Sequence, residues 1–205
     1  MGFLTGFLFL FLLFLSAVVI HELSHGFVAL AFGDTTAQRA GRLTLNPLKH
    51  VDPFGTVFLP LFLRLIGSPV TFGWAKPVPI NPFNLRHPKR DMLWIGMAGP
   101  VSNLLMALAA AGFLRLLGPG LPVTVVALIK YLALVNLVLG TFNLLPIPPL
   151  DGSRVLLSLV PARFAVGLIL MERWGFLLIF LLLYLGWIDK VLAPMIGFLV
   201  QLLGL

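Results

Sequence analysis

Long apolar runs, separated by short polar and proline-rich stretches, make up most of this 205-residue chain. Residues 3–32, 92–117 and 123–145 are each long enough for a helix to cross the hydrocarbon core of a bilayer, which is about 30 Å thick. Residues 164–188 form a fourth apolar run, which either crosses once more or has an interfacial start at Glu172-Arg173. Residues 190–205 form either a further span or an interfacial helix. The pattern predicts an all-α membrane protein, a polytopic helical bundle with 5–6 hydrophobic segments.

The part between the first two spans follows a different pattern. Residues 35–46 alternate loosely between apolar and polar, which predicts a short β-hairpin with Gly41 near its turn. The apolar run at residues 54–66 is short for a crossing and typical of a re-entrant segment. Residues 73–82 hold three prolines within six positions, so their backbone must be extended. We therefore expect a re-entrant, proline-rich loop beside the spans.

The composition agrees with a membrane protein. The chain is 60% hydrophobic and 10% charged, and its mean hydropathy is +1.06. Since no stretch is long and polar enough to fold as a soluble domain, we expect one domain over residues 1–205, with a core at about residues 3–160 and accessory helices at 161–205. The first 20 residues lack a basic start, so we do not expect a cleaved signal peptide.

The charge and cysteine content limit which partners and which metal ligands the chain can have. The net charge is +7, but the basic residues flank the apolar runs, which indicates membrane orientation rather than a nucleic-acid partner. The chain has no cysteine, so a metal ion could be held only by histidines and carboxylates.

The first apolar run contains His21-Glu22-Leu23-Ser24-His25. On a helix, side chains four positions apart share a face, so the two imidazoles can bind one zinc ion, while Glu22 can take a proton from water on the metal. A lone buried histidine is usually a packed core group. Here, however, two of four histidines flank one of two glutamates in hydrocarbon, where such groups are costly and mark functional sites.

Asp151 is the candidate third zinc ligand, because such a pair needs one more protein ligand and an open position. The site can form only if the end of the first span and residue 151 lie on the same side of the membrane. They do so if residues 54–66 are re-entrant, and they do not if this run crosses fully. The re-entrant topology also gathers the basic residues on one side, which the positive-inside rule makes cytoplasmic. That side then carries Arg39, Arg42, Lys49, Arg64, Lys76, Arg86, Lys89, Arg90, Arg154 and Arg163, against Arg115 and Lys190 on the other.

These motifs resemble the site-2 protease family of intramembrane zinc metalloproteases, over nearly the whole chain to about residue 160. The matching segments are His21-Glu22-Leu23-Ser24-His25-Gly26, His50-Val51-Asp52-Pro53-Phe54-Gly55, Gly73-Trp74-Ala75-Lys76-Pro77-Val78-Pro79, Gly99-Pro100-Val101-Ser102-Asn103 and Asn143-Leu144-Leu145-Pro146-Ile147-Pro148-Pro149-Leu150-Asp151-Gly152. The chain is most similar to members without PDZ or CBS domains.

The resemblance implies that His21, His25 and Asp151 bind one Zn²⁺ per chain and that Glu22 is the general base. On the sequence alone, Asp151-Gly152 could equally be a turn. The implied activity is hydrolysis of peptide bonds in or near transmembrane segments of membrane-protein substrates, which is regulated intramembrane proteolysis. The implied place is the cytoplasmic membrane, with the site toward the cytoplasm.

Three further residues are candidates for substrate binding or transition-state stabilisation. Asn103 and Asn143 resemble the polar residues around the family's cleft, although helix capping or interhelical hydrogen bonding would explain them as well. His50 could be an oxyanion donor or could support a ligand, and a loop histidine without a role is an equal alternative.

Other functions are compatible with part of the pattern. A membrane zinc-binding or zinc-transport protein could use the same two histidines and Asp151 without proteolysis. A membrane di-iron hydroxylase needs more histidine boxes than four histidines allow. A chambered zinc endopeptidase acting on lipidated peptides would need a downstream glutamate as ligand, and only Glu172 exists.

Overall fold

The structure, a computed structural model, describes residues 3–67 and 73–205. Within these residues all regular secondary structure is helical. The long helices are α1 (Phe3–Ala31), α4 (Pro88–Leu117) and α5 (Val123–Asn143). The remaining elements are α2 (Thr36–Arg39), η1 (Pro47–Lys49), η2 (Pro53–Phe58), α3 (Leu59–Leu65), η3 (Pro82–Asn84), η4 (Gly118–Gly120), α6 (Asp151–Leu159), α7 (Ala162–Glu172), α8 (Gly175–Tyr184) and α9 (Trp187–Leu203).

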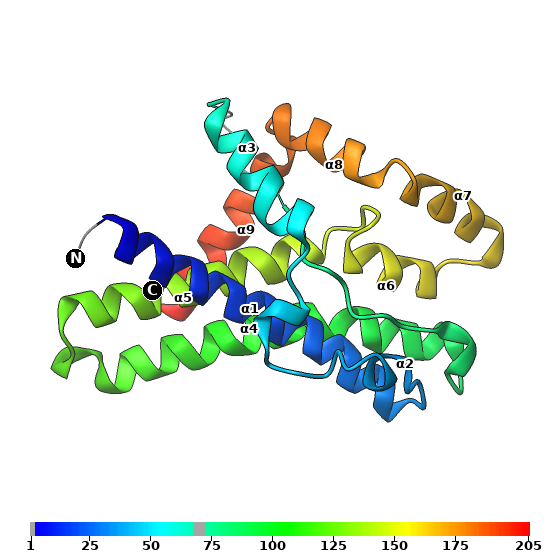
Figure 1. Cartoon of the computed structure of the whole chain (residues 1–205), viewed down its shortest axis with the longest axis horizontal. Helices are drawn as coiled ribbons and strands as arrows, with labels where there is room; N and C mark the ends of the chain where they lie inside the picture. Colours follow the sequence, from blue (N-terminus) through cyan, green and yellow to red (C-terminus); the bar gives the residue numbers. More distant parts are fainter. Residues whose placement is uncertain (1–2, 68–72) are drawn as a thin grey trace.

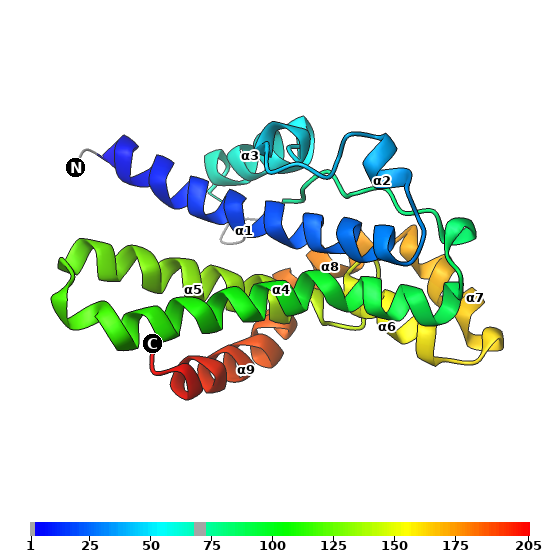
Figure 2. The same cartoon turned by 90° about the horizontal axis from the view of Figure 1, so that it is seen from below.

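Helices α1, α4 and α5 lie side by side and form the bundle that carries the site (Figures 1 and 2). They confirm the first three predicted spans, since each is long and apolar enough to cross a membrane. α4 presents small residues to its neighbours, and Gly96, Gly99 and Ala107 are buried there, which lets the helix backbones approach closely. α1 ends and α4 begins at the same end of the bundle, and α5 runs in the same direction as α1 but ends partway along α4 (Figure 2).

The prediction of a β-hairpin at residues 35–46 was wrong. The structure describes all of these residues and forms α2 at Thr36–Arg39, with no strand among them. The Asp34 carboxylate accepts a hydrogen bond from the Thr36 amide at 3.0 Å and starts this turn of helix. Gly41 then takes a φ of +62°, which ends the turn. Loose alternation over a dozen residues was a weaker signal than this local side-chain contact.

The chain between α1 and α4 leaves and re-enters the bundle at the same end (Figure 2). Pro53–Leu65 is a short apolar helix, and residues 73–81 are extended, as the prolines predict. Whether Pro53–Leu65 dips into the bilayer as a re-entrant segment stays a prediction.

The prediction of 5–6 hydrophobic segments is not confirmed. In the described residues three helices are long and apolar enough to span, or four if α8 and α9, which are bent by 77°, form one broken span. The run at 164–188 is not one helix, because it breaks at Arg173-Trp174 into α7 and α8, and Gly186 adopts a φ of +68° after α8. α9 lies against α5 on the outside of the bundle (Figure 2).

Candidate metal centre

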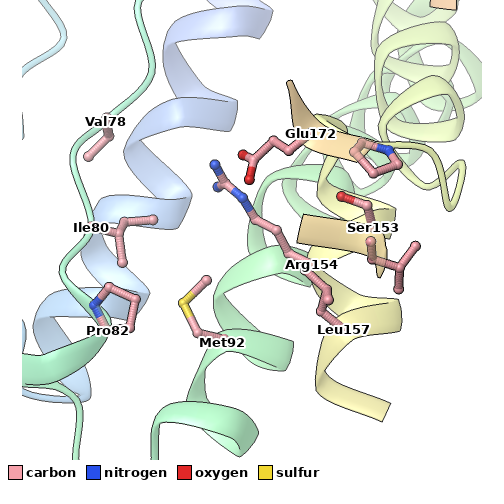
Figure 3. Close-up of a pocket in the computed structure, with 10 residues that line it drawn as sticks. Val78, Ile80, Pro82, Met92, Ser153, Arg154, Leu157 and Glu172 are labelled. Atoms are coloured by element: carbon pink, nitrogen blue, oxygen red, sulfur yellow. The ribbon is translucent and has the colours of Figure 1, made fainter. Parts of the chain in front are cut away.

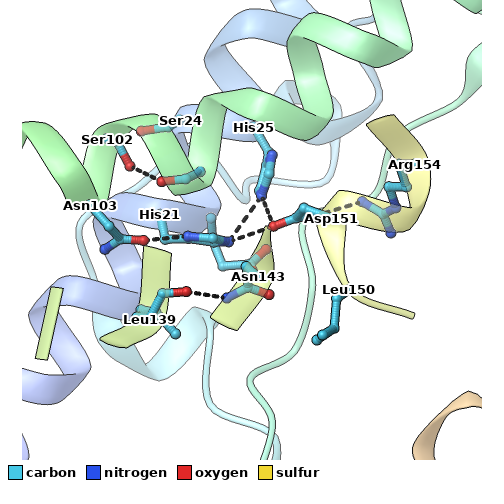
Figure 4. A network of polar contacts seen from close by, with 12 residues as sticks. His21, Ser24, His25, Ser102, Asn103, Leu139, Asn143, Leu150, Asp151 and Arg154 are labelled. Carbon is cyan, nitrogen blue, oxygen red and sulfur yellow. Dashed lines mark hydrogen bonds and ion pairs between the residues drawn. The ribbon is translucent and has the colours of Figure 1, made fainter. Parts of the chain in front are cut away.

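His21, His25 and Asp151 come together in the structure although Asp151 is far away in the sequence. The Nε2 atoms of His21 and His25 are 3.1 Å apart, and Asp151 Oδ2 lies 2.9 Å and 3.1 Å from them. All three side chains are buried (Figure 4). In a tetrahedral zinc site with bonds of about 2.0–2.1 Å, ligand atoms are separated by about 3.3 Å, so this spacing fits a single ion.

Each imidazole is oriented by a hydrogen bond from its other nitrogen. His21 Nδ1 donates to Asn103 Oδ1 on α4 at 2.5 Å, and His25 Nδ1 donates to the Ile95 carbonyl at 2.6 Å. With the proton on Nδ1, both Nε2 atoms have a lone pair directed at Asp151 (Figure 4). Asn103 also donates to Asn136 Oδ1 on α5 at 2.7 Å, so this support reaches all three long helices.

The space in front of the ligands depends on Gly99 of α4. A Cβ at this position would lie 2.4 Å from His25 Nε2 and 2.6 Å from His21 Nε2. Glycine is therefore required for α4 to pass so close to both ligand atoms. A nitrogen–nitrogen–oxygen donor set around a space that one methyl group would fill is what a zinc ion needs.

Asp151 is fixed by the packing on both sides of it. Leu150 is buried against Ile179, Ile188 and Leu192 of α8 and α9, and Gly152 lies so close to the Leu144 carbonyl that a Cβ would be 2.2 Å from it.

Glu22 follows His21 on α1 and is half-buried. Its Oε2 accepts a hydrogen bond from the Val78 amide at 2.8 Å. Val78 belongs to the extended residues 73–81, which run along α1 (Figure 2). A carboxylate beside the histidine pair, held by one backbone donor, is placed for proton transfer at this site.

The other sequence candidates fall in different places. Asn103 supports a ligand, and Asn143 lies beside the cluster at the end of α5, where its Nδ2 donates to the Leu139 carbonyl at 3.0 Å (Figure 4). His50 is not part of the cluster. It is fully buried in the loop region, and its Nε2 donates to the Thr44 carbonyl at 2.9 Å. In the described part of the chain its Nδ1 has no hydrogen-bond partner.

Sequence reasoning did not single out Val78, Asn136 or Arg154 for roles at the site. Asn136 could have been noticed as an amide inside an apolar span. Arg154 lies one helical turn after Asp151, and its Nη1 is 3.8 Å from Asp151 Oδ1. Val78 acts through its backbone amide, which leaves no signal in the side-chain pattern.

A cavity of about 270 Å³ lies between the extended segment, α4, α6 and α7. The Arg154 and Glu172 side chains point toward each other within it (Figure 3). Two of its lining residues also contact residues of the candidate site: Arg154 lies 3.8 Å from Asp151, and the Val78 amide donates to Glu22.

The known proteins that this chain resembles are peptidases. The family model described as peptidase family M50 matches residues 118–183, which include Asp151. The chain is 40% identical over 187 residues to "Putative zinc metalloprotease YwhC" of Bacillus subtilis, covering 87% of the chain and 81% of that protein. It is 30% identical over 169 residues to "Putative zinc metalloprotease Rip2" of Mycolicibacterium smegmatis, covering 82% of the chain and 64% of that protein. It is 27% identical over 158 residues to "Zinc metalloprotease MJ0392" of Methanocaldococcus jannaschii, covering 76% of the chain and 35% of that protein. No solved structure matches the chain.

Proposed function

The chain belongs to peptidase family M50, the site-2 protease family, and we propose that it hydrolyses peptide bonds in or near the transmembrane segments of other membrane proteins. Family membership and the apolar helices make it a multi-pass membrane zinc metalloprotease. The finer assignment is supported above all by one observation. A His-His-Asp cluster with a neighbouring glutamate is buried among helices long enough to span the bilayer.

We assign the metal ligands to His21, His25 and Asp151. When bound, Zn²⁺ supplies a Lewis acid for the scissile carbonyl and lowers the pKa of water in contact with it. Asn103 and the Ile95 carbonyl keep the two imidazoles in the tautomer that presents Nε2.

We assign proton transfer to Glu22. Its carboxylate accepts a proton from the attacking water and gives it to the amine that leaves, so it ends the cycle ionised as it began. The Val78 amide holds Oε2 and thereby fixes the direction in which the carboxylate faces. We assign to Asn143, which lies beside His21 (Figure 4), the role of holding substrate backbone or the oxyanion.

The substrate must enter as extended backbone, since a peptide bond inside a helix is shielded by its own hydrogen bonds. A transmembrane segment therefore has to unwind near the site before hydrolysis. Most basic residues lie between α1 and α4, at the start of α4 and after α5, and this distribution supports a position of the site toward the cytoplasmic face of the cell membrane.

The test uses purified protein in liposomes with a single-span peptide, and mass spectrometry locates the cut. We expect cleavage in or near the apolar segment by the wild type, and a loss of about 10²–10⁴-fold in kcat for Glu22→Gln. Cleavage of soluble peptides alone would refute the intramembrane assignment. Zinc flux that survives Glu22→Gln, without proteolysis by either protein, would instead support transport.

A further inference from the structure

Arg42 is a buried arginine whose charge faces backbone rather than an acid. Arg42 comes shortly after α2 in the chain, and it is 7% exposed. Nη2 donates to the Lys76 carbonyl at 2.7 Å and to the Pro77 carbonyl at 3.3 Å. Among the described residues no carboxylate forms an ion pair with it. Arginine is rarely buried without an acidic partner, so the position of this guanidinium requires an explanation.

The two carbonyls that Arg42 holds come immediately before Val78 in the chain. Val78 is the residue whose amide donates to Glu22 Oε2 at 2.8 Å. The extended backbone from Lys76 to Val78 therefore links the Arg42 guanidinium to the Glu22 carboxylate. Movement at Lys76 or Pro77 would carry the Val78 amide with it.

Close to Val78 the extended segment has few backbone donors. Pro77 and Pro79 lack an N–H, so near Val78 only Lys76 and Val78 can donate backbone hydrogen bonds. The Lys76 amide donates to the His50 carbonyl at 2.9 Å, and the Val78 amide is taken by Glu22. The carbonyls at 76 and 77 therefore depend on Arg42 for their protein partner.

We infer that Arg42 is a positioning residue for Glu22. Its guanidinium holds the carbonyls of residues 76 and 77, with His50 holding the neighbouring amide, so that the Val78 N–H fixes the Glu22 carboxylate beside the metal ligands. The inference rests on the proposed role of Glu22 in proton transfer. It explains why a charge is buried in a loop that contributes no metal ligand.

The arginine side chain is suited to holding two backbone carbonyls. A guanidinium stays protonated when buried and its planar fork can reach two successive carbonyls, whereas a lysine offers a single ammonium. Substitution of Arg42 should therefore loosen the segment without removing any group that touches zinc. Its effect should appear in kcat, because KM depends on substrate contacts and zinc content depends on the ligands.

The experiment compares wild type, Arg42→Gln, Arg42→Lys and Arg39→Gln in cleavage of a single-span peptide, with zinc content measured on each preparation. Arg39 is the matched control, since it lies in the adjacent helix α2 and is exposed. For Arg42→Gln we expect kcat to fall about 10–100-fold with one zinc per chain retained and KM within about twofold of the wild type. Arg42→Lys should recover part of the loss, and Arg39→Gln should match the wild type.

A second readout does not depend on activity. In zinc-free protein, hydrogen exchange of residues 73–81 should be about tenfold faster in Arg42→Gln than in wild type, with exchange in α1 unchanged. In a Glu22→Asp background, where the shorter carboxylate no longer reaches the Val78 amide, Arg42→Gln should change kcat by less than about twofold.

Wild-type kcat in Arg42→Gln, or equal losses in the two Glu22 backgrounds, would overturn the inference. If Arg42→Gln does not fold, Val78→Pro decides, because it removes the donor and leaves Arg42 in place. A lower kcat with zinc retained then supports the inference, and wild-type kcat overturns it. Failure of the wild type to cleave the peptide would count against the proposed function. The hydrogen-exchange measurement would still show whether Arg42 stabilises residues 73–81.

Discussion

Asn103 shows at the residue scale how a side chain that binds no metal can determine metal binding. It accepts the Nδ1 proton of His21 and donates to Asn136 at 2.7 Å, and it is fully buried. This pair of bonds sets both the tautomer and the ring plane of the ligand. Asn103 was expected in the cleft from its position after Gly99-Pro100. Its contact with His21 is more specific than that expectation.

Asn103→Ala should lower zinc affinity about 10–100-fold, because His21 loses the partner that selects its tautomer. Zinc affinity can be measured by competition with a chelator of known affinity. Ser102→Ala is the matched control, since this hydroxyl donates to the Gly99 carbonyl in its own helix. Equal affinities in Asn103→Ala and the wild type would show that Asn103 does not orient the ligand.

Gly99→Ala tests the space in front of the ligands. The added methyl group would come within 2.4 Å of His25 Nε2, so we expect the variant to lose zinc and peptide cleavage together. Gly112→Ala on the same helix is the control, because in the described structure a Cβ there meets nothing within 4 Å. A Gly99→Ala protein with one zinc per chain would contradict the assigned position of the ion.

Sequence reasoning predicted the three side chains that the structure brings together, but not the groups that hold them. His21, His25 and Glu22 follow from helix periodicity, and the convergence of Asp151 on the histidines follows from topology. Arg42 entered the sequence argument only as one of the basic residues on the predicted cytoplasmic side. Its contact with the carbonyls of Lys76 and Pro77 joins two loops that no periodic pattern relates.

At the scale of elements, the loop between α1 and α4 departs most from expectation, and Asp34 explains much of its shape. This buried carboxylate accepts hydrogen bonds from the Thr36 amide at 3.0 Å, the Asn81 amide at 2.7 Å and Asn84 Nδ2 at 2.9 Å. It therefore joins the start of α2 to the end of the extended segment. A lone Asp after a glycine looks like an ordinary helix end, so the sequence did not reveal this junction.

Asp34 makes the loop sensitive to acid. Burial alone would raise the pKa of its carboxyl, but hydrogen bonds from Thr36 and Asn84 and from the Asn81 and Thr36 amides outweigh it and lower this pKa below the ordinary 3.8. The unfolded chain then binds the proton more readily than the folded one. The stabilisation is complete above the ordinary pKa and is lost as the pH falls through the lower folded value.

We expect Asp34→Asn to destabilise the protein by about 2 kcal/mol near neutral pH, because hydrogen bonds to a charged group are replaced by weaker ones. The difference from wild type should shrink at pH values below the ordinary pKa. Thermal unfolding in detergent at several pH values measures it, with the exposed Asp189→Asn as control. A difference that does not depend on pH would exclude ionised Asp34 as the cause.

At the scale of the whole molecule, the even number of crossings between the two parts of the site is what lets it close. α1 and α5 run in the same direction because the chain between α1 and α4 returns to the end of the bundle that it left (Figure 2). This could be anticipated from the distribution of basic residues. The sequence offered Glu172-Arg173 as an alternative, interfacial start of the run at residues 164–188, and the chain breaks there, at Arg173-Trp174, into α7 and α8.

The sidedness of the site can be tested by labelling, since the chain has no cysteine of its own. Arg39→Cys and Gly120→Cys are exposed positions near opposite ends of the bundle. A membrane-impermeant maleimide applied to intact cells should label Gly120→Cys, and it should label Arg39→Cys only after permeabilisation. The reverse pattern would place the metal centre toward the outer face.

Zinc content and peptide cleavage, measured together on wild type, Glu22→Gln and Asp151→Ala, test the central claim most directly. The account predicts one zinc and cleavage for wild type, one zinc without cleavage for Glu22→Gln, and the loss of both for Asp151→Ala. Zinc retained at the wild-type level by Asp151→Ala, or cleavage at the wild-type rate by Glu22→Gln, would contradict it.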